Sequence, residues 1–361
     1  MTYLKQITPP NCGREKCSVI QTEHRRESGI ELLRIIAMFL VLTVHCGFRF
    51  LGIPTAEEAH SFFLETSSRL FFQNLSIGCV DIFVLISGWF GIKLTKKGLG
   101  KYLFQCLYFS ILLYVIALLF NISTLDIKGI VSTVFIGKEY WFVKSYLCLL
   151  LCAPILNEFV KHTTKRMHFN ILIALLSFQT VFAWIYPSVD FISNGYSVVS
   201  FSILYLLARY VRLYIAINLS EMKIALMIVG CILVNTVTQL TCVYYNIPGY
   251  RLITSYINPL VIFESLLFVV LFSRLKFSSN SINIIASSCF AVYLLHTHVS
   301  IFEPIFGSAV KTIYNDYNGF YCLMVFLCFL SFIFVFAILL DQPRKFLWKL
   351  LILNSHNNDE K

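Results

Sequence analysis

The chain has 361 residues, of which 58% are hydrophobic and 13% are charged, with a mean hydropathy of +0.75 and a formal net charge of +10. This composition excludes a soluble globular protein and predicts an all-α integral membrane protein, because apolar stretches of about 20 residues cross a bilayer as helices. Basic cytoplasmic loops account for the positive charge, so we expect no nucleic-acid partner.

Ten apolar stretches are predicted to span the membrane, with approximate ends. They cover residues 29–48, 75–92, 102–122, 140–157, 169–186, 198–213, 224–245, 255–272, 282–302 and 320–340. With the N-terminus in the cytoplasm, most of the 29 Lys and Arg residues fall in inside loops. We therefore expect about ten transmembrane helices with both termini cytoplasmic. The chain then divides into an N-terminal arm (1–28), a membrane domain (29–342) and a C-terminal tail (343–361).

The first span contains two residues that are costly in hydrocarbon, Arg34 and His45. Eleven residues at 100° each bring both side chains to one helix face, about 16 Å apart along the axis. The guanidinium of Arg34, close to the cytoplasmic end, suits an anionic ligand such as a phosphate. His45 is a candidate general base, although a structural core histidine would look the same. Glu31 either pairs with Arg34 or stabilises the helix start.

The second span contains Asp81 near its outer end, at a depth similar to that of His45. The Asp81 carboxylate is a candidate to orient the His45 imidazole by a hydrogen bond, and a role in helix packing is the alternative. Ser87 and Gly88 are small residues that favour close helix approach, and Ser87 has no neighbouring base that would make it a nucleophile.

A donor substrate with phosphates at one end of a long arm and a reactive group at the other, as in acyl-coenzyme A, would suit the spacing of Arg34 and His45. Three basic residues in later spans are candidates to contact such a donor. Lys144 lies one turn inside Trp141 in the fourth span and could face a donor or acceptor channel. Arg209 and Arg212 end the sixth span on the cytoplasmic side, where topology explains them first and contact with donor phosphates second.

The ninth span contains His296 and His298, whose two-residue spacing places the side chains about 200° apart on a helix and so does not favour a metal site. The twelve cysteines are scattered and mostly lie in spans. We expect no metal site and no disulfide framework.

Four segments, in order along the chain, resemble the membrane-bound acyltransferase 3 family. The first is Arg26–Ala37 followed by His45, which matches the family's pattern of an Arg, ten intervening residues and a His at Arg34 and His45. The other three are Gly78–Phe90, Tyr140–Leu147 with Pro154 and Asn157, and Ala291–His296. The chain departs from many members in having Glu31 where Asp is common, and we expect no appended extracellular domain.

The resemblance implies an O-acyltransferase, most often an O-acetyltransferase, of the bacterial inner membrane. Its co-substrate would be acetyl-CoA or another acyl-CoA, with no permanently bound cofactor. Its acceptor would be a surface polysaccharide such as O-antigen, or a lipid-linked oligosaccharide, and its other partner is membrane lipid. Arg34, Lys144, Arg209 and Arg212 would contact the donor, with His45, Arg34 and Asp81 in the catalytic site.

Two other functions fit the same composition. A polytopic transporter of a lipid-linked sugar or an acyl donor also has many helices and interior charges, although the chain lacks clear inverted repeats. A membrane sensor or assembly partner without catalysis is the third possibility. The sequence does not reveal the oligomeric state.

Overall fold

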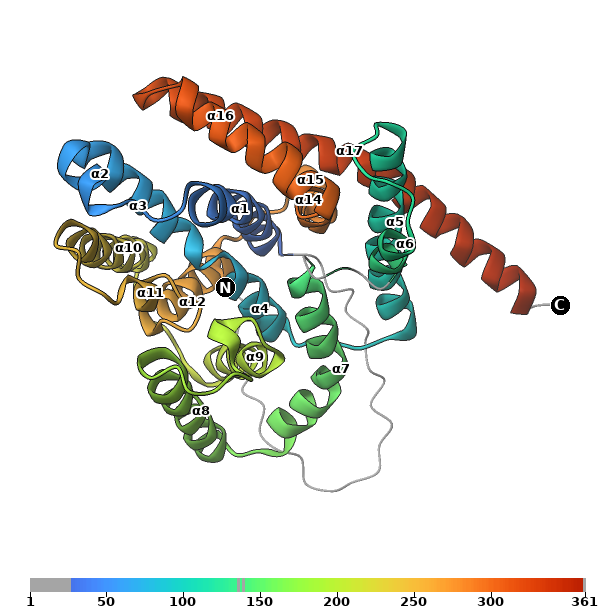
Figure 1. The fold of residues 1–361 in the computed structure, drawn as a ribbon. Helices are drawn as coiled ribbons and strands as arrows, with labels where there is room; N and C mark the ends of the chain where they lie inside the picture. The colour runs from blue at the N-terminus through green and yellow to red at the C-terminus, as the bar shows by residue number, and fades with distance from the viewer. Residues whose placement is uncertain (1–26, 135–136, 138–139, 360–361) are drawn as a thin grey trace.

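The computed structural model describes residues 27–134, 137 and 140–359 (Figure 1). These residues form helices and connecting segments and contain no strand, which confirms the predicted all-α class. The helices, in chain order, are α1 (Ser28–Val44), η1 (His45–Leu51), α2 (Ala56–Ser61), α3 (Phe63–Ile77), α4 (Cys79–Phe90), α5 (Lys96–Leu119), α6 (Ile127–Val134), α7 (Trp141–His162), α8 (Lys165–Gln179), η2 (Thr180–Ile185), η3 (Ser193–Gly195), α9 (Val198–Tyr214), α10 (Glu221–Tyr244), α11 (Tyr250–Ile253), α12 (Pro259–Arg274), α13 (Asn280–Ala286), α14 (Cys289–His296), α15 (Val299–Ile301), η4 (Phe302–Gly307), α16 (Ser308–Asp316) and α17 (Gly319–Asp359).

Within the described residues, seven helical segments are long and apolar enough to cross a membrane. The number is eight if Asn280–His296 and Val299–Asp316, which meet at 66°, form one bent span. These eight segments coincide with eight of the predicted spans. The other two predicted spans coincide with α9 and α12, which have only 17 and 16 residues. The structure thus shows a multi-pass membrane protein, while the count of ten spans stays a prediction.

Short polar side chains fix where many of these helices begin. Thr95, Thr164, Ser197, Ser220 and Asn258 precede α5, α8, α9, α10 and α12, and each side chain accepts a hydrogen bond from a backbone N–H of the first turn. Such caps satisfy amide groups that have no partner within the helix. The residues between the apolar stretches therefore define the start of each helix.

Helix α1 lies among the other helices and contacts α3, α4, α12, α13 and α14 (Figure 1). Leu33, Ala37 and Leu42 of α1 are completely buried. Gly29, at its start, lies so close to α12 that a Cβ atom there would be 2.7 Å from the carbonyl oxygen of Leu275. Helix α1 is therefore enclosed by other helices over much of its surface.

The predicted role of Gly88 in close packing is confirmed. A Cβ atom on Gly88 would lie 2.5 Å from the carbonyl oxygen and 2.8 Å from the Cα atom of Tyr205, so α4 and α9 approach each other at backbone distance. Small residues at such crossings are the usual means of packing helices within a membrane.

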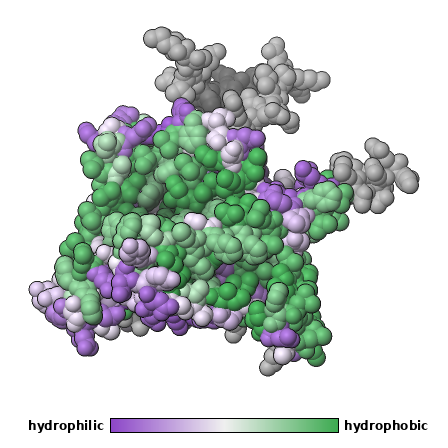
Figure 2. Space-filling view, turned by 90° about the horizontal axis from the view of Figure 1, so that it is seen from above, coloured by the Kyte–Doolittle hydropathy of each residue, from purple (hydrophilic) through white to green (hydrophobic). Residues whose placement is uncertain are grey.

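The surface of the molecule is apolar over its middle part. Hydrophobic side chains cover the centre of the face seen in Figure 2, and hydrophilic ones gather toward its upper and lower margins. Large apolar residues of α10 and α17 are exposed, among them Leu226, Val237, Phe332 and Leu339. A belt of this kind matches the hydrocarbon core of a bilayer.

One end of the bundle, here called the Arg34 end, unites segments that are far apart in sequence. Ser28 Oγ donates to Asn283 at 3.1 Å and accepts from the backbone N–H of Ser279 at 3.0 Å. Lys345 of α17 donates to Ser287 Oγ at 2.7 Å. The start of α1, the short helix α13 with the residue that follows it, and the middle of α17 therefore meet at this end, whereas η1 lies at the other end of α1.

The two predicted domain boundaries lie after residue 28 and after residue 342. Residues 1–26 of the predicted arm lie outside the described residues. The boundary expected after residue 342 falls inside α17, which continues from Gly319 to Asp359 and whose C-terminal end extends beyond the other helices (Figure 1). The cytoplasmic location of both termini stays a prediction.

Candidate active site

A cavity of about 430 Å³, here called the central cavity, runs beside α1. Arg34, Met38, Val41 and His45 all line it, at spacings of three and four residues along the helix. The prediction that Arg34 and His45 share one interior face is therefore confirmed. Since α1 is helical between them, the two side chains lie about 16 Å apart along its axis.

A second cavity, of about 510 Å³, lies at the opposite end from Arg34 and is here called the distal cavity. It shares Val44, His45, Trp141 and Tyr256 with the central cavity. Arg49 also lines it. His45 thus stands between two spaces, one reaching toward Arg34 and the other away from it.

The local backbone changes at His45. The α-helix ends at Val44, and His45 is the first residue of the π-helix η1. Short π-helical turns occur often at functional sites, because the wider turn redirects side chains. The imidazole also lies edge-on to Phe302, with ring centroids 5.1 Å apart, so an apolar wall supports it.

His45 has a partner that the sequence did not identify for it. Its Nδ1 atom lies 2.8 Å from Nε2 of His296, 251 residues later, and His296 is completely buried. The Nδ1 atom of His296 lies 2.6 Å from the carbonyl oxygen of Val292. In the sequence, His296 belongs to a segment that resembles the family, and its spacing from His298 does not favour a metal site. Neither observation indicates a contact with His45.

When both imidazoles are neutral, these two contacts determine which ring nitrogen of each histidine bears the proton. The Val292 carbonyl only accepts, so Nδ1 of His296 bears the proton and donates to it. Nε2 of His296 then accepts from Nδ1–H of His45. The Nε2 atom of His45 is left with a lone pair, which is the arrangement that a general base requires.

Arg34 forms the ion pair with Glu31 that the sequence allowed. Nη1 of Arg34 lies 2.8 Å from the Glu31 carboxylate, and 35% of the Arg34 side chain remains exposed. The carboxylate restrains the guanidinium within the cavity wall and still leaves N–H donors that no other carboxylate of the described residues contacts. Arg34 can therefore bind a further anion.

Aromatic side chains make up much of the central cavity between Arg34 and His45. Tyr102, Phe290 and Trp141 are among its lining residues, and the rings of Tyr102 and Phe290 stack with centroids 5.4 Å apart. Ser87 also lines the cavity, and its hydroxyl contacts the carbonyl of Phe83 at 2.9 Å. The cavity is thus a mostly apolar passage with charged groups at one end and an imidazole at the other.

The hydrogen bond expected between Asp81 and His45 is not present, because His296 takes that position. Asp81 is buried, its Oδ2 atom has no hydrogen-bond partner in the described part of the chain, and it does not line the central cavity. Val80 and Phe83 of α4 do line it, and Asp81 lies 100° around the helix from Val80. Asp81 is instead near Glu264 of α12.

The structure also places Lys144 away from the cavities. Phe142 and Tyr146 of α7 line the central cavity, whereas Lys144, midway between them, is exposed and points to the other side of the helix.

Arg209 and Arg212 lie at the end of α4 and line neither cavity. Arg212 donates to the carbonyl of Trp89 at 3.0 Å and lies over the ring of Phe90. Arg209 donates to the same carbonyl at 3.5 Å. Both residues thus stabilise a helix C-terminus, where carbonyl groups lack partners and cations are favoured.

Comparison with known proteins gives one result. A family model described as an acyltransferase domain matches residues 27–340 of this chain. No curated protein and no solved structure gives a significant match. The matched region contains Arg34, His45 and His296.

Proposed function

Since the chain belongs to the acyltransferase 3 family and is a membrane acyltransferase of that general kind, we propose that it is an O-acetyltransferase acting on a glycan. It would take the acetyl group from acetyl-CoA entering at the Arg34 end. It would pass that group to a hydroxyl of a surface polysaccharide or lipid-linked oligosaccharide in the distal cavity.

The observation that carries this proposal is the position of His45. The Nε2 lone pair of His45 belongs to a side chain that lines both the central and the distal cavity. A donor in one cavity and an acceptor in the other would meet at this imidazole. A neutral histidine is the usual general base for deprotonating a hydroxyl near neutral pH.

The proposed reaction follows from this placement. Nε2 of His45 takes the proton of the acceptor hydroxyl as its oxygen attacks the thioester carbonyl. The C–S bond then breaks, and the coenzyme A thiolate leaves and receives that proton, so the products are an O-acetyl ester and free coenzyme A. Nδ1–H of His45, hydrogen-bonded to His296, stabilises the imidazolium that forms in between.

A covalent route uses the same lone pair. His45 would first attack the thioester and form an acyl-imidazole, which the acceptor hydroxyl then opens. Incubation of the purified protein with radiolabelled acetyl-CoA, without acceptor, followed by rapid cold denaturation near neutral pH, separates the two routes, because only the covalent one leaves label on the protein and acid would hydrolyse an acyl-imidazole.

Arg34 supports the proposed direction of entry. At about 16 Å from His45 along α1 it is too far away to stabilise the reacting carbonyl, and its charge suits the phosphate end of a donor whose thioester reaches inward. The distribution of basic residues favours an orientation in which the Arg34 end faces the cytoplasm. The resemblance to the family implies a bacterial inner membrane, and the distal cavity would then lie on its far side.

The test is the ester content of the surface glycan. In cells that carry His45→Ala, mass spectrometry should show the loss of one acetyl group, C₂H₂O, from each acceptor unit. His162→Ala is the matched control, because that histidine is 70% exposed and lines neither cavity. An unchanged ester content in the His45→Ala cells would refute the catalytic role of His45.

The same assay addresses the two other functions considered from the sequence. A transporter of a lipid-linked sugar would change the amount of glycan and not its ester content. A sensor without catalysis would tolerate loss of the His45 imidazole. The family match favours the acyltransferase over both.

A further inference from the structure

A third cavity, of about 480 Å³ and here called the basic cavity, adjoins the central cavity at the Arg34 end. The two cavities share Lys101 and Ser287. The lining residues of the basic cavity come from α5, α13 and α17 and include Lys101, Asn280, Asn283, Ser287, Arg344, Lys345, Trp348 and Lys349. Four of its lining residues are basic and none is acidic, so basic groups outnumber acidic ones even with the neighbouring Asp341 included.

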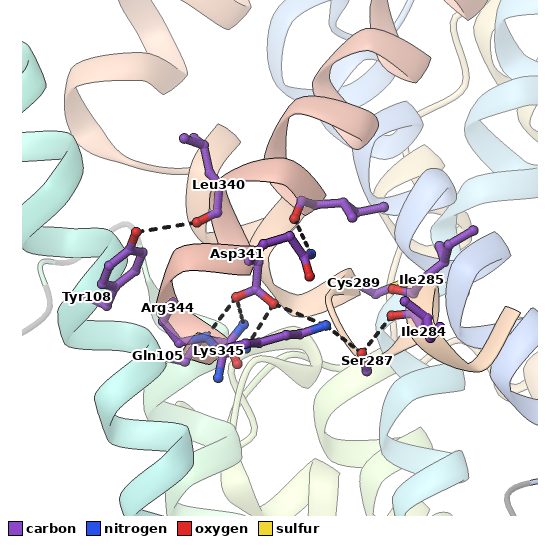
Figure 3. A network of polar contacts seen from close by, with 12 residues as sticks. Gln105, Tyr108, Ile284, Ile285, Ser287, Cys289, Leu340, Asp341, Arg344 and Lys345 are labelled. Atoms are coloured by element: carbon purple, nitrogen blue, oxygen red, sulfur yellow. Dashed lines mark hydrogen bonds and ion pairs between the residues drawn. The ribbon is translucent and has the colours of Figure 1, made fainter. Parts of the chain in front are cut away.

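Arg344 is the most constrained of these basic residues. It is completely buried, and its Nε and Nη2 atoms each donate to the Asp341 carboxylate at 2.8 Å (Figure 3). Gln105 of α5 donates to the same carboxylate at 3.2 Å. The third nitrogen, Nη1, is buried and has no hydrogen-bond partner within the described residues.

An unpaired N–H of a buried guanidinium is costly, because the group has lost its water without gaining an acceptor. The Asp341 carboxylate fixes the plane of the guanidinium, and Arg344 lines the basic cavity. The remaining donor is therefore held ready for an anionic oxygen. A phosphate supplies such oxygens and forms strong charge-assisted hydrogen bonds with arginine.

Three lysines line the basic cavity together with this arginine. Lys345 donates to Ser287 Oγ at 2.7 Å and lies 3.8 Å from the Asp341 carboxylate (Figure 3). Lys101 and Lys349 are more exposed and line the same cavity from α5 and α17. Their flexible stems allow the ammonium groups to adjust to phosphates at more than one position.

The cavity also offers contacts for a base. Trp348 presents an indole ring, and Asn280 and Asn283 provide amide groups that both donate and accept hydrogen bonds. Aromatic rings and amides are the groups that stack on and hydrogen-bond a heterocyclic base. N–H groups that donate hydrogen bonds to phosphates, together with a wall that can bind a base, are typical of a nucleotide site and not of a site for a simple inorganic anion.

We propose that the basic cavity binds the 3′-phosphorylated adenosine diphosphate end of the acyl-CoA donor. This inference rests on the proposed function. The pantetheine arm would leave the basic cavity between Lys101 and Ser287 and pass Arg34. It would continue along the central cavity until the thioester reaches His45.

The proposal assigns donor binding to residues different from those that the sequence suggested. Arg209 and Arg212 cap α4, and Lys144 points outward, so none of the three lines this route. Arg34 alone among the predicted donor contacts remains on it. The nucleotide would instead be held by α5 and α17, which are more than 200 residues apart in sequence.

The test measures binding of coenzyme A, dephospho-coenzyme A and pantetheine to the purified full-length protein in nanodiscs of neutral phosphatidylcholine. The wild type should bind coenzyme A at least about tenfold more tightly than dephospho-coenzyme A, because the latter lacks the 3′-phosphate. Lys101→Ala and Lys349→Ala should each weaken coenzyme A binding by about tenfold and leave pantetheine binding unchanged.

Matched variants separate this effect from a general loss of charge. Lys96→Ala removes an exposed lysine from the first turn of α5, outside both cavities, and should bind coenzyme A as the wild type does. Lys101→Arg keeps the positive charge and should retain most of the affinity. Both lysines to be replaced are exposed, so their loss should not prevent folding.

Each contrary result identifies which idea fails. If the wild type binds coenzyme A but Lys101→Ala and Lys349→Ala bind it equally well, the nucleotide site is wrong and the proposed function stands. If the wild type binds no coenzyme A, the donor in the proposed function is wrong and the inference falls with it. If the two variants lose affinity for anionic lipid vesicles but not for coenzyme A, the basic cavity is a lipid contact.

Discussion

Replacement of His296 by phenylalanine tests how the active site is built. Phenylalanine keeps a flat aromatic ring, somewhat larger than an imidazole, and the surroundings include the rings of Tyr293 and Phe306, with centroids 6.1 and 5.4 Å from that of His296. The substitution should therefore fold. It removes the acceptor of the 2.8 Å hydrogen bond from His45, so the His45 imidazole loses both its tautomeric preference and its orientation.

The magnitude follows from the hydrogen bond that is lost. A buried N–H left without a partner costs about 1–3 kcal/mol. If that cost falls mainly on the transition state, in which His45 bears a proton, the rate falls about 5- to 150-fold, because each 1.36 kcal/mol is a factor of ten. His296→Gln should recover much of the rate, because its amide carbonyl can still accept from His45.

The assay is the initial rate at which membranes containing the protein transfer label from radiolabelled acetyl-CoA into their glycan and lipid fractions. Coenzyme A binding to the same membranes serves as the control for folding. A His296→Phe rate within about twofold of the wild type would refute the positioning role. Equal losses of rate and of coenzyme A binding would also contradict it, because they would indicate a structural defect.

Three further substitutions test the packing and polar contacts of the fold, and thermal unfolding in detergent measures each. Gly88→Leu should lower the free energy of unfolding by about 1–3 kcal/mol, because its Cβ would lie 2.5 Å from the carbonyl oxygen of Tyr205; a neutral result would contradict the α4–α9 approach. Arg69→Met should lower it by about 1–3 kcal/mol, since the buried guanidinium donates to the Gly52 carbonyl at 2.8 Å at the end of η1. Arg49→Ala should lower it by less than about 1 kcal/mol, because its ion pair is more than half exposed; a larger loss would show that the pair is shielded from solvent.

The relation between Arg34 and His45 could be predicted because it lies within one helix. Once the apolar stretch is taken as an α-helix, the 100° step per residue fixes which side chains share a face. The pairing of Glu31 with Arg34 has the same origin, and so does the close packing at Gly88, which depends on the absence of a side chain. The all-helical class and the approximate positions of most spans followed from apolar length alone.

The partners of these residues could not be predicted in the same way. Nothing local to Asp81, Lys144 or Arg209 shows which neighbour each side chain faces. In a bilayer the faces toward lipid and toward protein are both apolar, so the periodicity that orients a helix in a soluble protein is weak. The rotation of α4 and α7 about their axes was therefore undetermined, and with it the positions of Asp81 and Lys144.

The sequence by itself determined a membrane acyltransferase with a charged residue and an imidazole on one interior helix face. Only the tertiary structure decided that His296 orients His45, that His45 separates two cavities, and that Lys101 and Arg344 meet at the Arg34 end. The physical reason is the range of the interactions. Helix periodicity is set by neighbouring residues, whereas these contacts join segments more than 200 residues apart and depend on how every helix between them packs.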